Sequence, residues 1–216
     1  MTMQLYGHPF SSYTWKALIA LYANDTPFEF AGLGEGKAEN EAFVQAASPQ
    51  GLFPVLRDGE KVVFEASAII EYLHLYHRGS QPLLPDGAEE AIEVRMIDRV
   101  FDNYVMSIVQ SSVGEAITTG KLSDETRQTV EAKLEKSYRW IDNWLAGYAN
   151  RDAITLIECA AAPSLFYADW VYQIPQDYSR LRDWRAHLLA QPAVSRCVED
   201  ARPYRSYFPL GAPDRD

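Results

Sequence analysis

The chain has 216 residues, of which 47% are hydrophobic and 23% are charged, and its formal net charge is −10 at pH 7. This length and composition predict one compact unit, or a small pair of units, with a sizeable core. The acidic balance excludes a nucleic-acid partner, which needs clustered lysines and arginines, and gives no reason to expect binding to an anionic membrane.

The sequence gives no indication of export or of membrane insertion. The N-terminal sequence lacks a basic start followed by an apolar run, so it shows no secretory signal. No stretch approaches the roughly 18 apolar residues that span a bilayer. Cys159 and Cys197 lie far apart in the sequence and fit no metal-ligand spacing. We therefore expect a cytoplasmic protein without a metal site, in which Cys159 is a small buried hydrophobe.

The first part of the chain alternates between strand-like and helix-like segments. Short β-prone runs at 3–6 and 26–31 flank a helical pattern at 12–23, and a second short helix is expected at 38–47. Strands that alternate with helices predict parallel pairing.

A hairpin and a third helix follow. Runs at 53–56 and 61–64 are β-prone, and Asp58-Gly59 between them predicts a two-residue turn with positive φ at both positions. Pro54 has no N–H, which favours the first position of an edge strand and makes a cis peptide bond plausible. Helical periodicity starts near Ala66. A helix N-terminus beside an open strand edge would attract a carboxylate.

The remainder of the chain reads as helix. Turn-forming residues at 79–82 and 85–87 break the pattern, and apolar residues then recur at helical spacing over 97–108 and 130–145. Thr155 and Glu158 form a capping box before an apolar helix, which Pro163 should kink. Further helices are expected near 178–190 and 192–201. The sequence thus predicts an α/β unit at 1–79, a linker at 80–87 and an all-helical unit at 88–216.

Three segments in this order resemble the cytosolic glutathione transferase family over essentially the whole chain. They are SPQGLFPVL at 48–56, EASAIIEYL at 65–73 and TLIECAAAP at 155–163. The resemblance implies a thioredoxin-like N-terminal domain, an all-helical C-terminal domain and usually a homodimer. It also implies a bacterial-type detoxification enzyme that uses glutathione as cosubstrate and needs no metal.

The same resemblance implies where glutathione binds. The backbone of Phe53 and Pro54 would hold the cysteinyl part, and the helix start at Glu65 would hold the γ-glutamyl end. The family has Ser after the acidic residue, whereas this chain has Ala66 there and Ser67 one residue later. Losing one neutral hydrogen bond costs about 1 kcal/mol, roughly fivefold in affinity. Ser67 would replace it only in part, because it is turned by about 100° around the helix.

The start of the first helix resembles the serine-type subgroup. Ser11, with Ser12 second, would donate its hydroxyl to the glutathione sulfur and favour the thiolate, the better nucleophile. The alternative is that these serines only cap the helix. Tyr6, the activator of a tyrosine-type enzyme, is expected to pack in the core. Lys16 is expected to be either a solvated charge or a site residue.

The resemblance also implies an apolar pocket for an electrophile. Phe10, Phe101, Tyr104 and Tyr167 are its candidates, and the alternative for the helical aromatics is burial in the core. We expect transfer of glutathione to small hydrophobic electrophiles. The alternatives are a zeta-type maleyl isomerase, which would have Cys where this chain has Tyr13, and a non-catalytic interaction module of the same fold.

Overall fold

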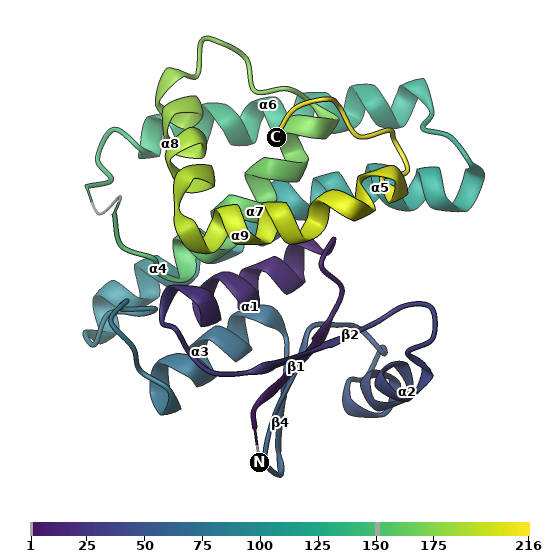
Figure 1. Ribbon diagram of the computed structural model, residues 1–216. Helices are drawn as coiled ribbons and strands as arrows, with labels where there is room; N and C mark the ends of the chain where they lie inside the picture. Colours follow the sequence, from purple (N-terminus) through teal and green to yellow (C-terminus); the bar gives the residue numbers. More distant parts are fainter. Residues whose placement is uncertain (1, 150–151) are drawn as a thin grey trace.

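The computed structural model describes residues 2–149 and 152–216, which form an α/β unit and a helical unit packed on each other (Figure 1). The α/β unit contains β1 (Gln4–Gly7), α1 (Ser12–Ala23), β2 (Glu29–Gly32), α2 (Ala38–Ala47), β3 (Val55–Asp58), β4 (Lys61–Phe64) and α3 (Ala66–Tyr76). Helices α1 and α3 lie on the side of the sheet that faces the helical unit. The predicted bounds of α1 and α2 and the predicted start of α3 are confirmed.

The four strands form one mixed sheet in the order β2-β1-β3-β4. β1 pairs with β2 in parallel, and β3 pairs with both β1 and β4 antiparallel, as the alternating pattern and the hairpin predict. β3 is therefore an inner strand, and the prediction that Pro54 begins an edge strand is wrong. Pro54 precedes β3 after a cis peptide bond, so its missing N–H removes no bond from the ladder.

The hairpin turn lies one residue later than Asp58-Gly59. Asp58 pairs with Lys61 at the end of β3, which leaves Gly59-Glu60 as the turn, and only Gly59 has positive φ, at 60°. The side chain of Asp58 explains the shift. Its carboxylate accepts a hydrogen bond from Tyr72 Oη at 2.9 Å and lies 2.7 Å from His77 Nε2, so both α3 contacts hold it in the strand.

The second unit is helical, as predicted. It contains α4 (Ala88–Phe101), a π-helical turn (Asp102–Met106), α5 (Ser107–Thr119), α6 (Asp124–Trp144), α7 (Leu156–Val171), α8 (Ser179–Ala190), α9 (Pro192–Ala201) and a 3-10 turn (Arg202–Tyr207). The π-helical turn joins α4 directly to α5, and the sequence pattern did not predict it. Such turns recur at functional sites. Within the described ranges, no helix is long and apolar enough to cross a membrane.

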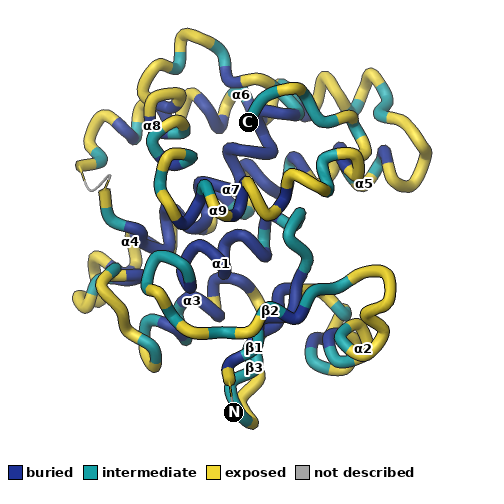
Figure 2. The backbone as a smooth tube through the Cα atoms, in the orientation of Figure 1, coloured by how far each residue is buried: buried dark blue, intermediate teal, exposed yellow. Residues whose placement is uncertain are grey.

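Helix α7 passes through the middle of the molecule, where Figure 2 shows it buried along its length. The predicted capping box is confirmed: Thr155 Oγ accepts from Ile157 N at 3.1 Å, and Glu158 accepts from Thr155 N at 2.9 Å. Burial raises the pKa of the Glu158 carboxyl. Cys159 on this helix is a buried free thiol, as expected.

One hydrophobic core runs through both units. Trp15 of α1 packs on Phe166 of α7 with ring centroids 4.9 Å apart, and both belong to the same buried cluster. The α/β unit ends with α3 at Tyr76, and the helical unit begins with α4 at Ala88. The bounds 1–79, 80–87 and 88–216 for the two domains and their linker stay a prediction.

Candidate functional site

Two neighbouring clefts lie where the α/β unit meets the helical unit. The first, which we call the charged cleft, has a volume of about 380 Å³ and lies between the loop before β3, the start of α3 and the end of α4. Four residues that the sequence predicts for glutathione line it: Phe53, Pro54, Glu65 and Ala66. Tyr13, Arg99, Asp102 and Asn103 line it as well. The loop before β3 and the start of α3 thus lie around one cleft, and their role in binding glutathione stays a prediction.

The second, which we call the apolar cleft, has a volume of about 360 Å³. Phe10, Ser11, Ser12 and Tyr167 line it, together with apolar side chains of the π-helical turn, α5 and the C-terminal segment. Phe53 lines both clefts. The two clefts therefore adjoin at Phe53, and residues at the start of α1 line the apolar one.

Ser11 and Ser12 have different environments at that point. Ser11 is the N-cap of α1, and its Oγ accepts from Thr14 N at 3.3 Å. This bond uses a lone pair, so the hydroxyl hydrogen of Ser11 can still be donated. Ser12 is buried, and its Oγ has no hydrogen-bond partner among the described residues. A buried polar atom of this kind is costly unless a ligand or water satisfies it.

Ser67 does not face the charged cleft. Its hydroxyl donates to Asp98 Oδ2 at 2.9 Å and accepts from Lys16 Nζ at 2.9 Å, and the side chain is buried. The expectation that Ser67 partly replaces the hydroxyl missing at Ala66 is therefore wrong. One step along α3 turns this side chain toward α1 and α4, where its hydroxyl both donates and accepts a hydrogen bond.

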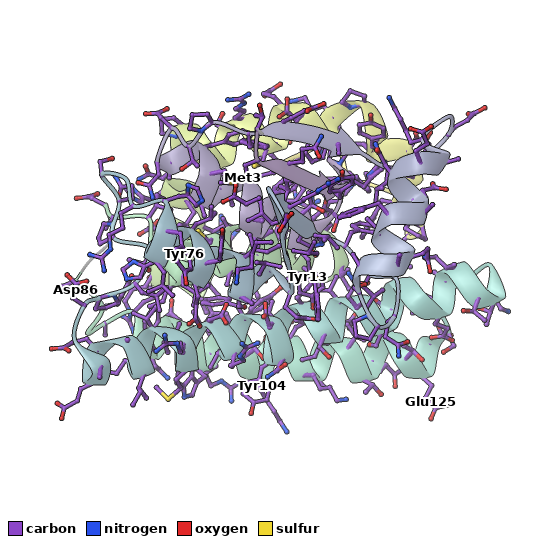
Figure 3. All side chains as sticks on the ribbon, turned by 90° about the horizontal axis from the view of Figure 1, so that it is seen from below. Met3, Tyr13, Tyr76, Asp86, Tyr104 and Glu125 are labelled. Carbon is purple, nitrogen blue, oxygen red and sulfur yellow. The ribbon has the colours of Figure 1, made fainter. Side chains whose placement is uncertain are left out.

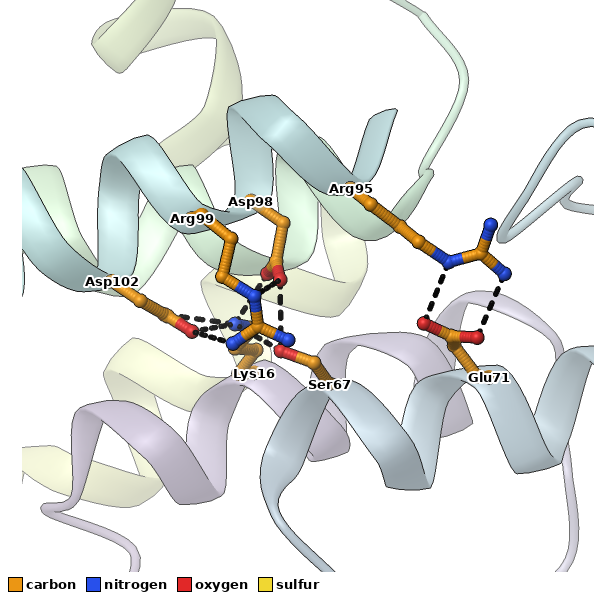
Figure 4. A network of polar contacts seen from close by, with 7 residues as sticks. All are labelled: Lys16, Ser67, Glu71, Arg95, Asp98, Arg99 and Asp102. Carbon is orange, nitrogen blue, oxygen red and sulfur yellow. Dashed lines mark hydrogen bonds and ion pairs between the residues drawn. The ribbon is translucent and has the colours of Figure 1, made fainter. Parts of the chain in front are cut away.

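Lys16 is the centre of a buried ionic network between α1, α3 and α4 (Figure 4). Its Nζ lies 2.5 Å from Asp98 Oδ1, as an ion pair outside hydrogen-bond geometry, and 2.8 Å from both carboxylate oxygens of Asp102. Only 2% of the side chain is exposed, so a solvated Lys16 is excluded. Desolvation by burial raises the pKa of Asp98, and the charge of Asp102 raises it further, against the lowering effect of Lys16.

Three further polar groups stand at the wall of the charged cleft. Burial, with Asp102 and Glu65 nearby, raises the pKa of Tyr13 to about 12, so its hydroxyl stays protonated and can donate. Asp102 is held by Lys16, as described. Arg99 lies 3.8 Å from Asp98 and 3.7 Å from Asp102, with 58% of its side chain exposed. The cleft therefore presents both signs of charge.

Two of the predicted pocket residues lie elsewhere. Phe101 is fully buried in the core, where its ring is 5.8 Å from that of Trp184. Tyr104 is 60% exposed and lies at the outer edge of the long helices in Figure 3, whereas Tyr13 lies between them and the α/β unit. Neither Phe101 nor Tyr104 lines a cleft described above, so both assignments are corrected. The π-helical turn changes the helical phase after Phe101, which a regular period misses.

Phe10 and Tyr167 do meet at the apolar cleft. Tyr167 Oη donates to the carbonyl of Phe10 at 2.8 Å, and their rings lie edge to face with centroids 5.5 Å apart. Tyr6 lies apart from both clefts, packed on Phe43 with its hydroxyl on Gln4. His8 lines the apolar cleft; its Nδ1 accepts from Phe10 N at 3.1 Å, and burial lowers its pKa.

The polar residues that the sequence motifs missed are Tyr13, Arg99 and Asp102. Tyr13 had a local signal, because it follows the candidate serines within the first turn of α1. Arg99 and Asp102 had none, since they reach the cleft only through the packing of α4 against α1 and α3. Over residues 2–149 and 152–216, no group of three or more His, Cys, Asp or Glu side chains is placed to hold a metal ion.

The sequence is similar to those of known proteins. Residues 5–81 match the family model described as glutathione S-transferase, N-terminal domain. The chain is 30% identical over 207 residues to glutathione S-transferase F6 of Arabidopsis thaliana, covering 91% of this chain and 99% of that protein. It is 24% identical over 212 residues to a probable maleylacetoacetate isomerase of Vibrio cholerae, covering 94% and 98%.

Solved structures show the same fold. A glutathione S-transferase from Methylobacillus flagellatus with glutathione bound matches with a TM-score of 0.76 and 21% identity, over 91% of this chain and 98% of that one. At this identity the likeness bears on the fold alone.

Proposed function

This chain belongs to the glutathione transferase family, and we propose that it joins the thiolate of glutathione to small hydrophobic electrophiles. The observation that carries the proposal is that Phe53 lines both the charged cleft and the apolar cleft. A tripeptide in the first brings its central cysteine to the entrance of the second. The two substrates then meet beside Ser11 and Ser12, which gives the proximity that a two-substrate reaction needs.

The charged cleft suits the tripeptide. Phe53 and Pro54 offer backbone to the cysteinyl part, and Glu65 attracts the α-ammonium of the γ-glutamyl group. Glu65 begins α3 without a side-chain cap. The first-turn amides of α3 are then available to the α-carboxylate. Ala66 supplies no hydroxyl there. This loss still weakens binding by about 1 kcal/mol, because Ser67 is engaged elsewhere.

Ser11 stabilises the glutathione thiolate in this proposal. A free thiol has a pKa near 8.5, so little of it is ionised at neutral pH. Donation of the Ser11 hydroxyl to sulfur lowers that pKa, and the positive end of α1 adds to the effect. Ser12 offers a second donor, whose lack of a protein partner suits contact with a ligand or water. No residue of this mechanism needs a metal ion.

The apolar cleft then holds the electrophile. Phe10 and Tyr167, fixed against each other, form one wall, and the apolar residues of α5 form another. We place the enzyme in the cytoplasm, with a role in detoxification and with both cysteines as buried free thiols.

We also propose a homodimer. Leu75 and Tyr76 of α3 and Ile92 and Met96 of α4 are exposed apolar side chains on neighbouring helices. Arg95 of α4 and Glu71 of α3 form an ion pair that ties these helices together. Light scattering should give twice the chain mass, and a monomer would contradict this part.

The second candidate is the maleyl isomerase, favoured by the Vibrio cholerae relative. It would use the same thiolate to add to, and leave, a maleyl double bond. Turnover of a maleyl substrate without turnover of an aryl halide would favour it. Failure to bind glutathione at millimolar concentration would favour the interaction module.

Turnover of glutathione with an activated aryl halide tests the proposal. Ser11→Ala should lower kcat about 10-fold to 100-fold and move the pH at which the rate rises toward that of a free thiol. The matched control is Ser123→Ala, because Ser123 caps α6 as Ser11 caps α1, by accepting from the amide three residues on. Ser123→Ala should leave the rate unchanged. Unaltered turnover in Ser11→Ala would contradict the role of Ser11.

A further inference from the structure

The guanidinium of Arg99 in the charged cleft has N–H donors that its two neighbouring carboxylates do not use in hydrogen bonds. Of the described residues that line this cleft, it is the one with a cationic side chain. Its contacts with Asp98 and Asp102, at 3.8 and 3.7 Å, are longer than hydrogen bonds. Arg95, one turn earlier on α4, is by contrast fixed by two hydrogen bonds to Glu71 at 2.9 and 2.8 Å. The planar donor fork of Arg99 thus remains available to a carboxylate.

Arg99 and Ala66, the position without the hydroxyl, line the same charged cleft. Arg99 Nε lies 3.8 Å from Asp98 Oδ2, and that same oxygen accepts a hydrogen bond from Ser67 at 2.9 Å. Ser67 directly follows Ala66 in the first turn of α3. Figure 4 shows Arg99 with the two carboxylates that it approaches, Asp98 and Asp102. The long, flexible side chain of Arg99 therefore belongs to the same cleft wall in which Ala66 supplies no hydroxyl.

The charges around this point suit a ligand that carries both an ammonium and a carboxylate. Lys16 and Arg99 are two cations facing the two carboxylates of Asp98 and Asp102. If Arg99 turns to a ligand carboxylate, the ligand ammonium can take its place beside Asp102, with Glu65 on the same wall. After this exchange of partners, each charge of the ligand and of the cleft still has an opposite charge beside it. A partly buried site requires such pairing, because an unpaired charge there is costly.

We propose that Arg99 binds the α-carboxylate of the γ-glutamyl group of glutathione, in place of the hydroxyl absent at Ala66, while Asp102 joins Glu65 in binding the α-ammonium. This inference rests on the proposed function, because it adds contacts within the same cleft. It makes Arg99 a determinant of specificity for ligands that keep the α-carboxylate.

Calorimetry with two ligands tests this assignment. The first is glutathione, and the second is γ-aminobutyryl-cysteinyl-glycine, which lacks only the α-carboxylate. Wild-type protein should bind glutathione about tenfold more tightly than the analogue, the value of a charge-assisted hydrogen bond at a partly exposed site. Arg99→Gln should remove most of this preference by weakening glutathione alone, because the first-turn amides of α3 still face the α-carboxylate. Arg95→Gln, the matched control on the same helix, should keep it. Ala66→Ser added to Arg99→Gln should recover part of the loss.

The outcomes separate this inference from the proposed function. If wild-type protein and Arg99→Gln prefer glutathione over the analogue to the same extent, Arg99 does not bind the α-carboxylate and the inference is overturned. Equal weakening of both ligands by Arg99→Gln would also overturn it. Wild-type protein that binds neither ligand would contradict the proposed function and the inference with it. Binding of the analogue by Arg99→Gln with the wild-type affinity would show that the variant is folded, so a folding defect cannot hide the answer.

Discussion

Replacing Lys16 by Met removes the only ammonium of the ionic network while keeping most of the side-chain volume. Of the cations among the described residues, Arg99 alone then still pairs with Asp98, at 3.8 Å. Removing one partner of a buried pair costs about 3–5 kcal/mol. The side chains of Lys16 and Asp98 are 2% and 1% exposed, so this range for buried pairs applies.

A second route gives the same magnitude. Without Lys16, Asp98 escapes an unpaired buried charge by keeping a proton in the folded state. Its ordinary pKa is 3.8, about three units below pH 7. Each unit costs about 1.4 kcal/mol, so a neutral Asp98 at pH 7 costs about 4 kcal/mol. At pH 5 the same cost falls below about 2 kcal/mol.

The sign follows from proton binding. Above pH 3.8 the unfolded chain loses the Asp98 proton, whereas the folded Lys16→Met variant keeps it, so the variant becomes less stable as pH rises. Urea unfolding at pH 5 and pH 7 measures this, with Lys136→Met on the exposed face of α6 as the control. A loss below about 1 kcal/mol at pH 7, or an equal loss at both pH values, would refute the reasoning.

Two further predictions concern the supports of the fold. Thr155→Ala should lower the free energy of unfolding by about 1–2 kcal/mol, because the N-cap bond and a hydrogen bond to the buried Glu158 are both lost. Urea unfolding at pH 7 measures this, and a free energy of unfolding equal to that of wild type would contradict the role of the capping box. The hydrogen bond from Tyr72 lowers the pKa of Asp58, so this carboxylate stabilises the fold above pH 3.8 and the effect is lost as pH falls through its lowered folded pKa. Asp58→Asn should thus melt below wild type at pH 7, and the difference should shrink as pH falls below 3.8. A constant difference would count against the assignment.

Local chemistry made most of the fold predictable. The period of 3.6 residues gave the bounds of α1, α2 and α9, and the capping box at Thr155 gave the start of α7. The errors arose where a distant contact outweighs a local preference. Asp58 lies in a strand rather than a turn because Tyr72 and His77 hold its side chain.

The candidate site was predictable to the extent that it lies on contiguous segments. Phe53, Pro54 and Glu65 flank one hairpin, so a single stretch of sequence brings them together. The surroundings of Lys16 and Arg99 were not predictable, because Lys16 meets Asp98 and Asp102, beside Arg99, only when α1 packs against this part of the chain. A lysine in an amphipathic helix looks solvated until the carboxylates opposite it are known.

A structure determined with glutathione bound tests the central claim most directly. The account predicts the tripeptide in the charged cleft, with its cysteinyl part against Phe53 and Pro54 and its γ-glutamyl end at Glu65. The sulfur should point into the apolar cleft within hydrogen-bond distance of the Ser11 or Ser12 hydroxyl. Glutathione bound outside the charged cleft, or a sulfur directed away from both serines, would contradict it.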